Sequence, residues 1–164
     1  MATIAWFLLI GAMTSCFYKG IDAKSCCQEW RQFGDSCYFF STINRNWTSA
    51  QENCKKHGGY LTELGTVEEF NFMRNTLREI APTSCYDINW YLGASDVGQE
   101  GKFIWMHSKT DIGSFLVWES GEPNNYGGDE DCMAAGSLND YRLNDLYCHR
   151  SDKKVFSICE KPAD

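Results

Sequence analysis

Carboxylate and carboxamide side chains gather in one stretch of this sequence and again shortly after it. The stretch is Glu122–Cys132, which reads EPNNYGGDEDC, and Leu143-Asn144-Asp145 follows it. Neither histidine nor thiolate is interleaved, and hard oxygen donors of this kind suit Ca²⁺, which takes about 6–8 oxygen ligands. Like charges at this density repel one another without a cation. A calcium site is therefore one hypothesis, and a solvated acidic loop is the other.

Other chemistries fit these residues less well. An EF-hand does not fit, because no D-x-D-x-D-G frame ends in glutamate at its twelfth position. Zinc would favour CxxC pairs or Cys/His spacing, and the sequence has no CxxC. The histidines at 57, 107 and 149 accompany no G-x-S-x-G or H-E-x-x-H pattern. Paired carboxylates could act in a glycosidase, but Asn124 and Asn144 would then have no role, so we expect no enzyme and no catalytic residue.

Composition limits the classes of protein to consider. The chain has 164 residues, with 22 Asp and Glu against 15 Lys and Arg, and a formal net charge of −7. We therefore expect no nucleic-acid binding. Hydrophobic residues at 43% and charged residues at 23% are near the averages for globular domains, which argues against disorder. Nine cysteines in so short a chain are typical of an oxidising compartment.

An apolar run, Ile4–Met13, lies close to the N-terminus. It is too short to span a bilayer and has the position and length of a signal-peptide core, with cleavage expected after Ala23 and an earlier cut near Ser15 as the alternative. A buried N-terminal helix is the alternative. We expect a signal peptide at residues 1–23 and one secreted, soluble domain at residues 24–164. No membrane span is expected there, because no later apolar run reaches about 18 residues.

Two helices are expected in the first half of the mature chain. The first is predicted to begin at Thr48, which forms a capping-box pattern with Gln51, and to end at a pair of glycines. The second is predicted to begin after Thr66, paired with Glu69, and to stop before Pro82. Apolar positions of the second helix recur at i+3/i+4 spacing: Val67, Phe70, Met73, Leu77 and Ile80.

Short apolar and aromatic runs predict strands. They cover residues 36–40, 60–61, 90–93, 103–105, 147–148 and 155–159. Residues 106–145 are rich in Gly, Asn, Asp and Ser, so we expect a long irregular region there, which inside a compact domain is usually functional. Early helices, with strands on both sides of a long loop, indicate an α+β fold.

The spacing of several motifs resembles that of the C-type lectin-like domain along nearly the whole mature chain. Trp90-Tyr91-Leu92-Gly93 looks like the family's W-I-G-L strand, Glu122-Pro123-Asn124 matches its EPN motif, and Leu143-Asn144-Asp145 resembles its W-N-D motif. Glu130 follows eight residues after Glu122, as in sugar-binding members. The resemblance implies a C-type lectin fold, with two helices packed on antiparallel sheets and a long calcium-binding loop region, stapled by disulfides. Residues 91–96 are also similar to secreted mollusc lectins of the perlucin type.

The resemblance implies one principal site for Ca²⁺ and sugar. Its expected metal ligands are Glu122, Asn124, Glu130, Asn144 and Asp145, and the first four would also contact the sugar. In the family the bond before the motif proline is cis, which would let both flanking side chains face one ion. Leu143 replaces the tryptophan of the W-N-D motif at a packing position, so we expect weaker calcium affinity rather than its loss.

A second, auxiliary Ca²⁺ site is also implied. It would be formed by Asp96, Glu100, Asn125, Glu130 and Asp131, with Asn125 at a position where the family frequently has a carboxylate. The alternative is that Asp96 and Glu100 are ordinary turn and surface residues. Because carboxylate ligands must be ionised to hold the metal, we expect calcium and sugar to be released as the pH falls towards about 4 to 5.

Removal of the leader would leave eight cysteines, an even number that fits a disulfide framework. They are Cys26, Cys27, Cys37, Cys54, Cys85, Cys132, Cys148 and Cys159. The resemblance implies the bridges Cys54–Cys159 and Cys132–Cys148, with an added N-terminal bridge Cys26–Cys37. Cys27 and Cys85 stay unassigned, and they could pair with each other or link subunits into a disulfide-linked homo-oligomer.

The function that the resemblance implies is that of a secreted, calcium-dependent lectin for glycans on microbial or cell surfaces, acting in agglutination or innate-immune recognition. In the family, EPN goes with mannose, N-acetylglucosamine, glucose and fucose, whereas QPD goes with galactose. One alternative is a shell or biomineral matrix protein whose acidic loops bind calcium carbonate. Another is a protein-binding C-type lectin-like domain without sugar activity, which the intact Glu122-Pro123-Asn124 and Asn144-Asp145 disfavour.

Overall fold

The structure, a computed structural model, describes residues 25–81, 87–149 and 154–164. The expected signal peptide and Cys85 lie outside these ranges. The elements, in chain order, are β1 (Arg31–Phe33), β2 (Ser36–Ser41), α1 (Trp47–Lys56), β3 (Tyr60–Leu61), α2 (Val67–Ile80), β4 (Ile88–Ser95), β5 (Ile104–Trp105), a 3₁₀ turn η1 (Tyr126–Gly128), β6 (Cys132–Gly136), a 3₁₀ turn η2 (Ser137–Asn139), β7 (Arg142–Leu146) and β8 (Lys154–Pro162). None of the described helices is long and apolar enough to cross a membrane.

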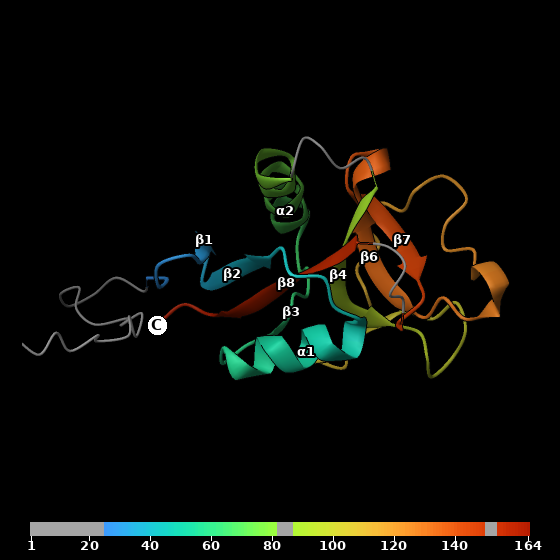
Figure 1. Cartoon of the computed structure of the whole chain (residues 1–164), viewed down its shortest axis with the longest axis horizontal. Helices are drawn as coiled ribbons and strands as arrows, with labels where there is room; N and C mark the ends of the chain where they lie inside the picture. The colour runs from blue at the N-terminus through green and yellow to red at the C-terminus, as the bar shows by residue number, and fades with distance from the viewer. Residues whose placement is uncertain (1–24, 82–86, 150–153) are drawn as a thin grey trace, which may run out of the picture.

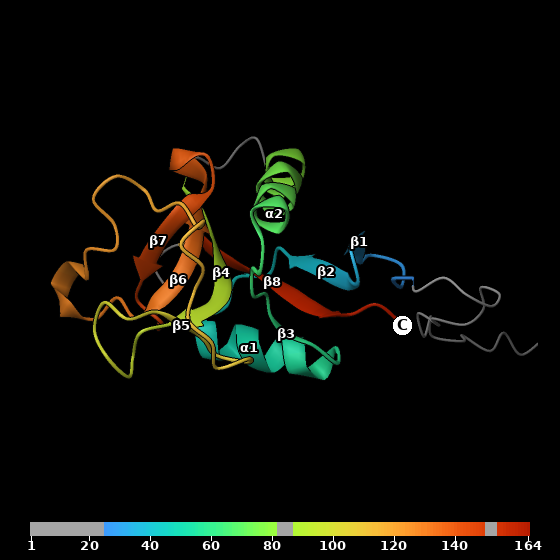
Figure 2. The same ribbon diagram turned by 180° about the vertical axis from the view of Figure 1, so that it is seen from behind.

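The strands form a mixed sheet. Its order is β1-β2-β8-β4-β6-β7, with β3 paired to β8 and β5 paired to β4. The expected α+β class is confirmed, but the expectation of antiparallel sheets needs correction, because β4 and β8 run parallel, with Trp90 opposite Phe156. The two helices lie on opposite sides of β8 in both views (Figures 1 and 2). The β1–β2 hairpin lies at one end of the molecule, and η1 lies at the other (Figure 1).

The first helix begins one residue earlier than the sequence suggested. Asn46, not Thr48, is its N-cap, and the Asn46 side chain accepts a 2.8 Å hydrogen bond from the backbone N–H of Ser49. The reason is the burial of Trp47, whose indole N–H donates to the carbonyl of Leu92 in β4 at 2.8 Å. The second helix begins where it was predicted to begin. Thr66 is its N-cap, and the Thr66 hydroxyl accepts a hydrogen bond from the backbone N–H of Glu69.

Residues 106–145 are less irregular than expected. They contain β6 and most of β7, which pair in antiparallel register with Ala134 opposite Asn144. Residues 147–148, expected as a strand, instead follow the end of β7. The sequence of β6, CMAAG, has few of the β-branched and aromatic residues that favour strands. It is a strand because it is fully buried between β4 and β7, where small side chains fit.

The core and the disulfides hold the sheet and loops together. Leu143 has no exposed surface and belongs to the main core cluster, which confirms its expected packing role. The three expected bridges are present: Cys26–Cys37, Cys54–Cys159 and Cys132–Cys148. Cys27 is disulfide-bonded as well. The bridge Cys54–Cys159 ties α1 to β8 and closes a sequence separation of 105 residues.

Candidate functional site

The segment around Pro123 is held against β7 by one carboxylate. Asp145, only 1% exposed, accepts hydrogen bonds from two successive backbone N–H groups, from Asn124 at 3.2 Å and from Asn125 at 2.7 Å. The Glu122–Pro123 bond is cis, as the resemblance implied. A side chain on a strand thus fixes the position of the loop that carries the expected ligands.

Glu122 shares its surroundings with Asp145. Burial, followed by a hydrogen bond with the Asp145 carboxyl and the charge of that carboxyl, raises the pKa of Glu122 above its usual value of 4.5. The nearby amide of Asn124 acts in the opposite direction. Glu122, Asn124 and Asp145 are therefore brought together as expected, and the two carboxyls repel each other when both are ionised.

Two buried oxygens at this site have no hydrogen-bond partner among the described residues: Glu122 Oε2 and Asn144 Oδ1. Asn144 lies on β7 directly before Asp145. Buried polar atoms are almost always paired in native proteins, because leaving one unpaired costs about 1–3 kcal/mol. Both atoms are acceptors, so a cation is a chemically suitable partner. The residues present therefore fit Ca²⁺, which is bound through oxygens.

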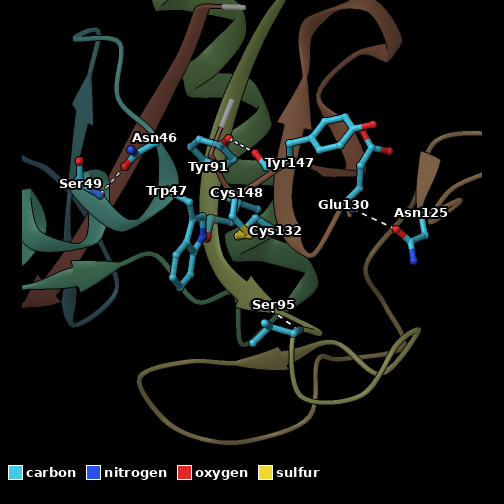
Figure 3. The surroundings of a disulfide bond; sticks show 12 residues. Asn46, Trp47, Ser49, Tyr91, Ser95, Asn125, Glu130, Cys132, Tyr147 and Cys148 are labelled. Atoms are coloured by element: carbon cyan, nitrogen blue, oxygen red, sulfur yellow. Dashed lines mark hydrogen bonds between the residues drawn. A yellow bond between two sulfur atoms is a disulfide. The ribbon is translucent and has the colours of Figure 1, made fainter. Parts of the chain in front are cut away.

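Glu130 is held within its own loop, against Asn125 and Tyr126. It is 5% exposed, its carboxylate accepts from the N–H of Tyr126 at 3.0 Å, and its N–H donates to the Asn125 side chain at 3.0 Å (Figure 3). Among the described residues, no three His, Cys, Asp or Glu side chains are close enough to hold a metal by themselves. A calcium site here would therefore need further oxygens, and the side-chain amides of Asn124 and Asn144 are candidates.

The residues of the expected auxiliary site also lie near one another. Asp96 is 2% exposed, and one carboxylate oxygen accepts from the N–H of Gly101 at 2.8 Å, while Oδ1 has no partner among the described residues. Burial, and then the charges of Glu100 and Asp131, raise the pKa of Asp96. The Asn125 amide donates to the Glu100 carboxylate. Asp96 is therefore not an ordinary exposed turn residue, although Glu100 is exposed.

Two tyrosines at this site were not among the expected site residues, namely Tyr126 and Tyr147. Tyr147 donates from its hydroxyl to the carbonyl of Tyr126 at 2.8 Å, and its own carbonyl accepts from Tyr91 at 2.6 Å. Tyr147 adjoins the Cys132–Cys148 bridge (Figure 3). A side chain at Gly127 would place Cβ 2.4 Å from the Tyr147 hydroxyl, and φ at Gly127 is +76°, so glycine is required. Tyr126 itself is 73% exposed. Its position in the sequence, shortly after the EPN motif, could have identified it as a candidate site residue.

Comparison with proteins of known sequence gives the same family as the motifs. The family described as "Lectin C-type domain" matches residues 43–161. CD209 antigen-like protein D of Mus musculus is 36% identical over 139 residues, which cover 84% of this chain and 53% of that protein. The chain thus spans about half the length of this relative. A perlucin-like protein of Mytilus galloprovincialis is 27% identical over 147 residues, covering 90% of this chain and 88% of that protein.

A solved structure shares the fold. The carbohydrate-recognition domain of cow CD23, determined in the presence of a GlcNAc2Man3 oligosaccharide, superposes with a TM-score of 0.72 and is 25% identical. The match covers 87% of this chain and 99% of that one. The motifs, the disulfides, the topology and the family match agree, and this chain belongs to the C-type lectin domain family.

Proposed function

We propose that this chain is a secreted, calcium-dependent lectin that binds mannose-type sugars at the loop site formed by residues 122–130 and 144–145. The observation that carries the proposal is that two buried acceptor oxygens, Glu122 Oε2 and Asn144 Oδ1, have no hydrogen-bond partner in the described part of the chain, with Glu122 beside the Asp145 carboxyl. C-type lectin domains generally bind Ca²⁺. An acidic loop that was merely solvated would expose these oxygens to water instead.

Five side chains would hold the principal ion: Glu122, Asn124, Glu130, Asn144 and Asp145. When bound, Ca²⁺ supplies positive charge and open coordination positions for two neighbouring sugar hydroxyls. Asp145 keeps the loop backbone in place through its two N–H contacts. The auxiliary residues, Asp96, Glu100, Asn125, Glu130 and Asp131, would hold a second ion, which would support the loop around Asn125.

The order of donors and acceptors determines which sugar fits. A glutamate carboxylate only accepts hydrogen bonds, whereas the amide of asparagine also donates. Glu122 therefore accepts a hydrogen bond from one sugar hydroxyl, and the Asn124 amide donates one to a hydroxyl oxygen. This is the order that the family associates with mannose, N-acetylglucosamine, glucose and fucose. The cow CD23 domain, which was studied with a mannose-containing oligosaccharide, supports this class of ligand.

A glycosidase does not fit this family. C-type lectins are carbohydrate-binding proteins that catalyse no reaction, and the paired carboxyls of Glu122 and Asp145 would have a role in metal binding.

We infer that the protein acts outside the cell, where its partners are glycans on microbial or cell surfaces and its role is agglutination or innate-immune recognition. The cysteine content supports this location.

Affinity chromatography tests the proposal directly. The protein is loaded on mannose-agarose in the presence of calcium and eluted with chelator or with free mannose. We expect retention with calcium and elution by both agents. Passage through the column in calcium, or elution by galactose alone, would contradict the mannose-type assignment. Retention that survives chelation would contradict calcium dependence.

A biomineral matrix protein is the second candidate. The similarity to the mussel perlucin-like protein covers 88% of that protein, whereas only 53% of the mouse relative is covered. The acidic side chains of Glu100 and Asp129 are exposed at the loop region. A protein that sediments with calcium carbonate crystals, and passes through the mannose column, would favour this candidate.

A homo-oligomer linked through Cys85 is proposed as an accessory feature, because Cys27 is already disulfide-bonded within the single chain. Several linked sites can raise the apparent affinity of weak sugar binding by about 10²–10⁴-fold. Electrophoresis of the secreted protein with and without reductant tests this. A dimer band that disappears on reduction supports linkage, and a monomer in both lanes contradicts it.

Amino-terminal sequencing of the same sample would locate the expected cleavage after Ala23.

A further inference from the structure

An apolar pocket lies directly beside the loop that carries the proposed sugar ligands. Its volume is about 330 Å³. Its lining includes the apolar side chains of Phe103, Ile112, Trp118 and Pro123, together with Lys102 and Asp111. Pro123 is the central residue of the EPN motif. One wall of the pocket is therefore continuous with the segment that holds Glu122 and Asn124.

The walls of this pocket are held in place by the rest of the fold. The rings of Phe103 and Trp118 lie 5.0 Å apart between centroids and are inclined by 55°. Trp118 forms a β-bridge with Leu143, the residue before Asn144, and Asp111 forms one with Ile104 in β5. Phe103 is only 4% exposed. The pocket is thus pre-formed, so a ligand would not need to order its walls on binding.

The lining identifies the chemistry of an occupant. Four apolar side chains with two charged groups of opposite sign are the usual composition of a small-molecule pocket, which is mostly apolar with few polar groups. The charges of Lys102 and Asp111 cancel, so a neutral group is favoured over an anion or a cation. A second sugar ring carries hydroxyls that the apolar walls would leave unpaired, which costs free energy.

We propose that this pocket binds a neutral apolar group attached to the sugar, such as the aryl or alkyl aglycone of a glycoconjugate. The inference rests on the proposed function, because the sugar held at Glu122 and Asn124 brings the attached group to Pro123. The chain would then recognise a glycoconjugate through two adjoining regions, one polar and one apolar. Sugars with an apolar aglycone would bind more tightly than the same sugars with a methyl group.

Calorimetric titration with methyl α-mannoside and phenyl α-mannoside tests this inference. Partial burial of a phenyl ring predicts an affinity about fivefold higher for the phenyl glycoside. Ile112→Trp, which fills the pocket, should remove this difference while leaving the affinity for methyl α-mannoside unchanged. Val117→Ala is the matched control, because Val117 is 43% exposed, adjoins Trp118 and does not line the pocket.

A second measurement keeps the test independent of the folding of the variants. In saturation-transfer NMR on the unmodified protein, the phenyl protons of phenyl α-mannoside should receive saturation at least as strongly as the sugar protons. Equal affinities for the two glycosides, or weak saturation of the phenyl protons, would overturn the inference while leaving the proposed function intact. A larger gain from a mannose disaccharide than from the phenyl group would also overturn it. Absence of binding by both glycosides would overturn the proposed function and this inference together.

Discussion

The carboxylate of Asp145 accepts a 2.7 Å hydrogen bond from the backbone N–H of Asn125, 20 residues earlier in the chain. The same carboxylate accepts from Asn124 and raises the pKa of Glu122. One strand residue therefore combines two functions, since it fixes the loop backbone and supplies negative charge to the proposed ion. Mutations at this position should consequently affect calcium binding more than mutations at other acidic residues of the loop.

Replacement of Asp145 by asparagine should weaken calcium binding by about 10- to 100-fold. The variant loses one negative charge at the site and one of the two acceptors that hold the loop backbone. Calorimetric titration with calcium chloride measures the change. Asp129→Asn is the matched control, because Asp129 is exposed in the same loop and is not an expected ligand. Equal losses in both variants would indicate a general charge effect rather than a specific ligand.

The pH dependence of stability should differ between the calcium-free and calcium-loaded protein. The pKa of Glu122 is raised above 4.5 in the folded chain, so above this pH the folded state holds more protons than the unfolded state. The free energy of unfolding of the calcium-free protein therefore decreases as the pH rises through the raised pKa. Bound calcium requires the ionised form and stabilises the folded state. The gain in Tm from calcium should be larger near pH 7 than near pH 4.5.

Thermal unfolding in calcium and in calcium-free buffer measures this gain at each pH. Glu122→Gln is the informative variant, because the glutamine cannot ionise. It should reduce the pH-dependent decrease in the stability of the calcium-free protein. A gain in Tm from calcium that is the same at both pH values would contradict a role for ionised carboxyls. Because the raised pKa belongs to the site, release of calcium should begin above the range of about 4 to 5 that unperturbed carboxyls would give.

The sequence predicted those parts of the fold that depend on local patterns. The start of α2 at Thr66 followed from a cap and an apolar periodicity. The start of α1 did not, because Asn46 and Thr48 are both suitable caps and the choice depends on the distant bond between Trp47 and Leu92. The strand β6 was missed because its small residues favour a strand only when β4 and β7 lie on both sides.

The candidate site likewise has some residues that the sequence predicted and some features that it did not. The motif identified Glu122, Asn124 and Asp145 because the family's oxygen ligands occur at fixed spacing. The hydrogen bonds of Tyr147 to Tyr126, and the pocket between Phe103 and Trp118, arise where loop segments meet after folding. No local pattern encodes such a meeting, so these features required the structure.

Tyr126 should contribute to sugar binding without contributing to stability. Its side chain is 73% exposed beside the EPN motif, while its backbone is fixed by Glu130 and Tyr147. An exposed aromatic ring on a fixed backbone segment next to a binding site is available for contact with a ligand. Tyr126→Ala should lower the affinity for mannose by about threefold to tenfold, with Tm and calcium affinity unchanged. Ile43→Ala removes a side chain that is also exposed, at 59%, and should leave sugar affinity unchanged.

The N-terminal bridge should support stability but not binding. Cys26–Cys37 closes a sequence separation of 11 residues near the β1–β2 hairpin, at the end of the molecule opposite η1 (Figure 1). The chain-entropy relation gives about 3 kcal/mol for a loop of this size, against about 5 kcal/mol for Cys54–Cys159. The double variant Cys26→Ser/Cys37→Ser should therefore unfold at lower denaturant concentration and retain its calcium affinity. If the double variant lost as much calcium affinity as Asp145→Asn, the bridge would not be independent of the calcium site at the other end of the molecule.

Exchange of the carboxylate and the amide on either side of Pro123 should change the sugar preference. In Glu122→Gln/Asn124→Asp the number of oxygen donors to calcium and the net charge stay the same, but the hydrogen-bond donor and acceptor change places. Calcium affinity should change by less than about tenfold, whereas mannose binding should fall and galactose binding should rise, as the family's QPD pattern implies. Binding of the variant to mannose-agarose and to galactose-agarose, each with calcium, measures the exchange. The single variant Glu122→Gln is the control, because it removes a charge without restoring it and should weaken binding to both columns. Undiminished mannose binding by the double variant would mean that these two side chains do not select the sugar.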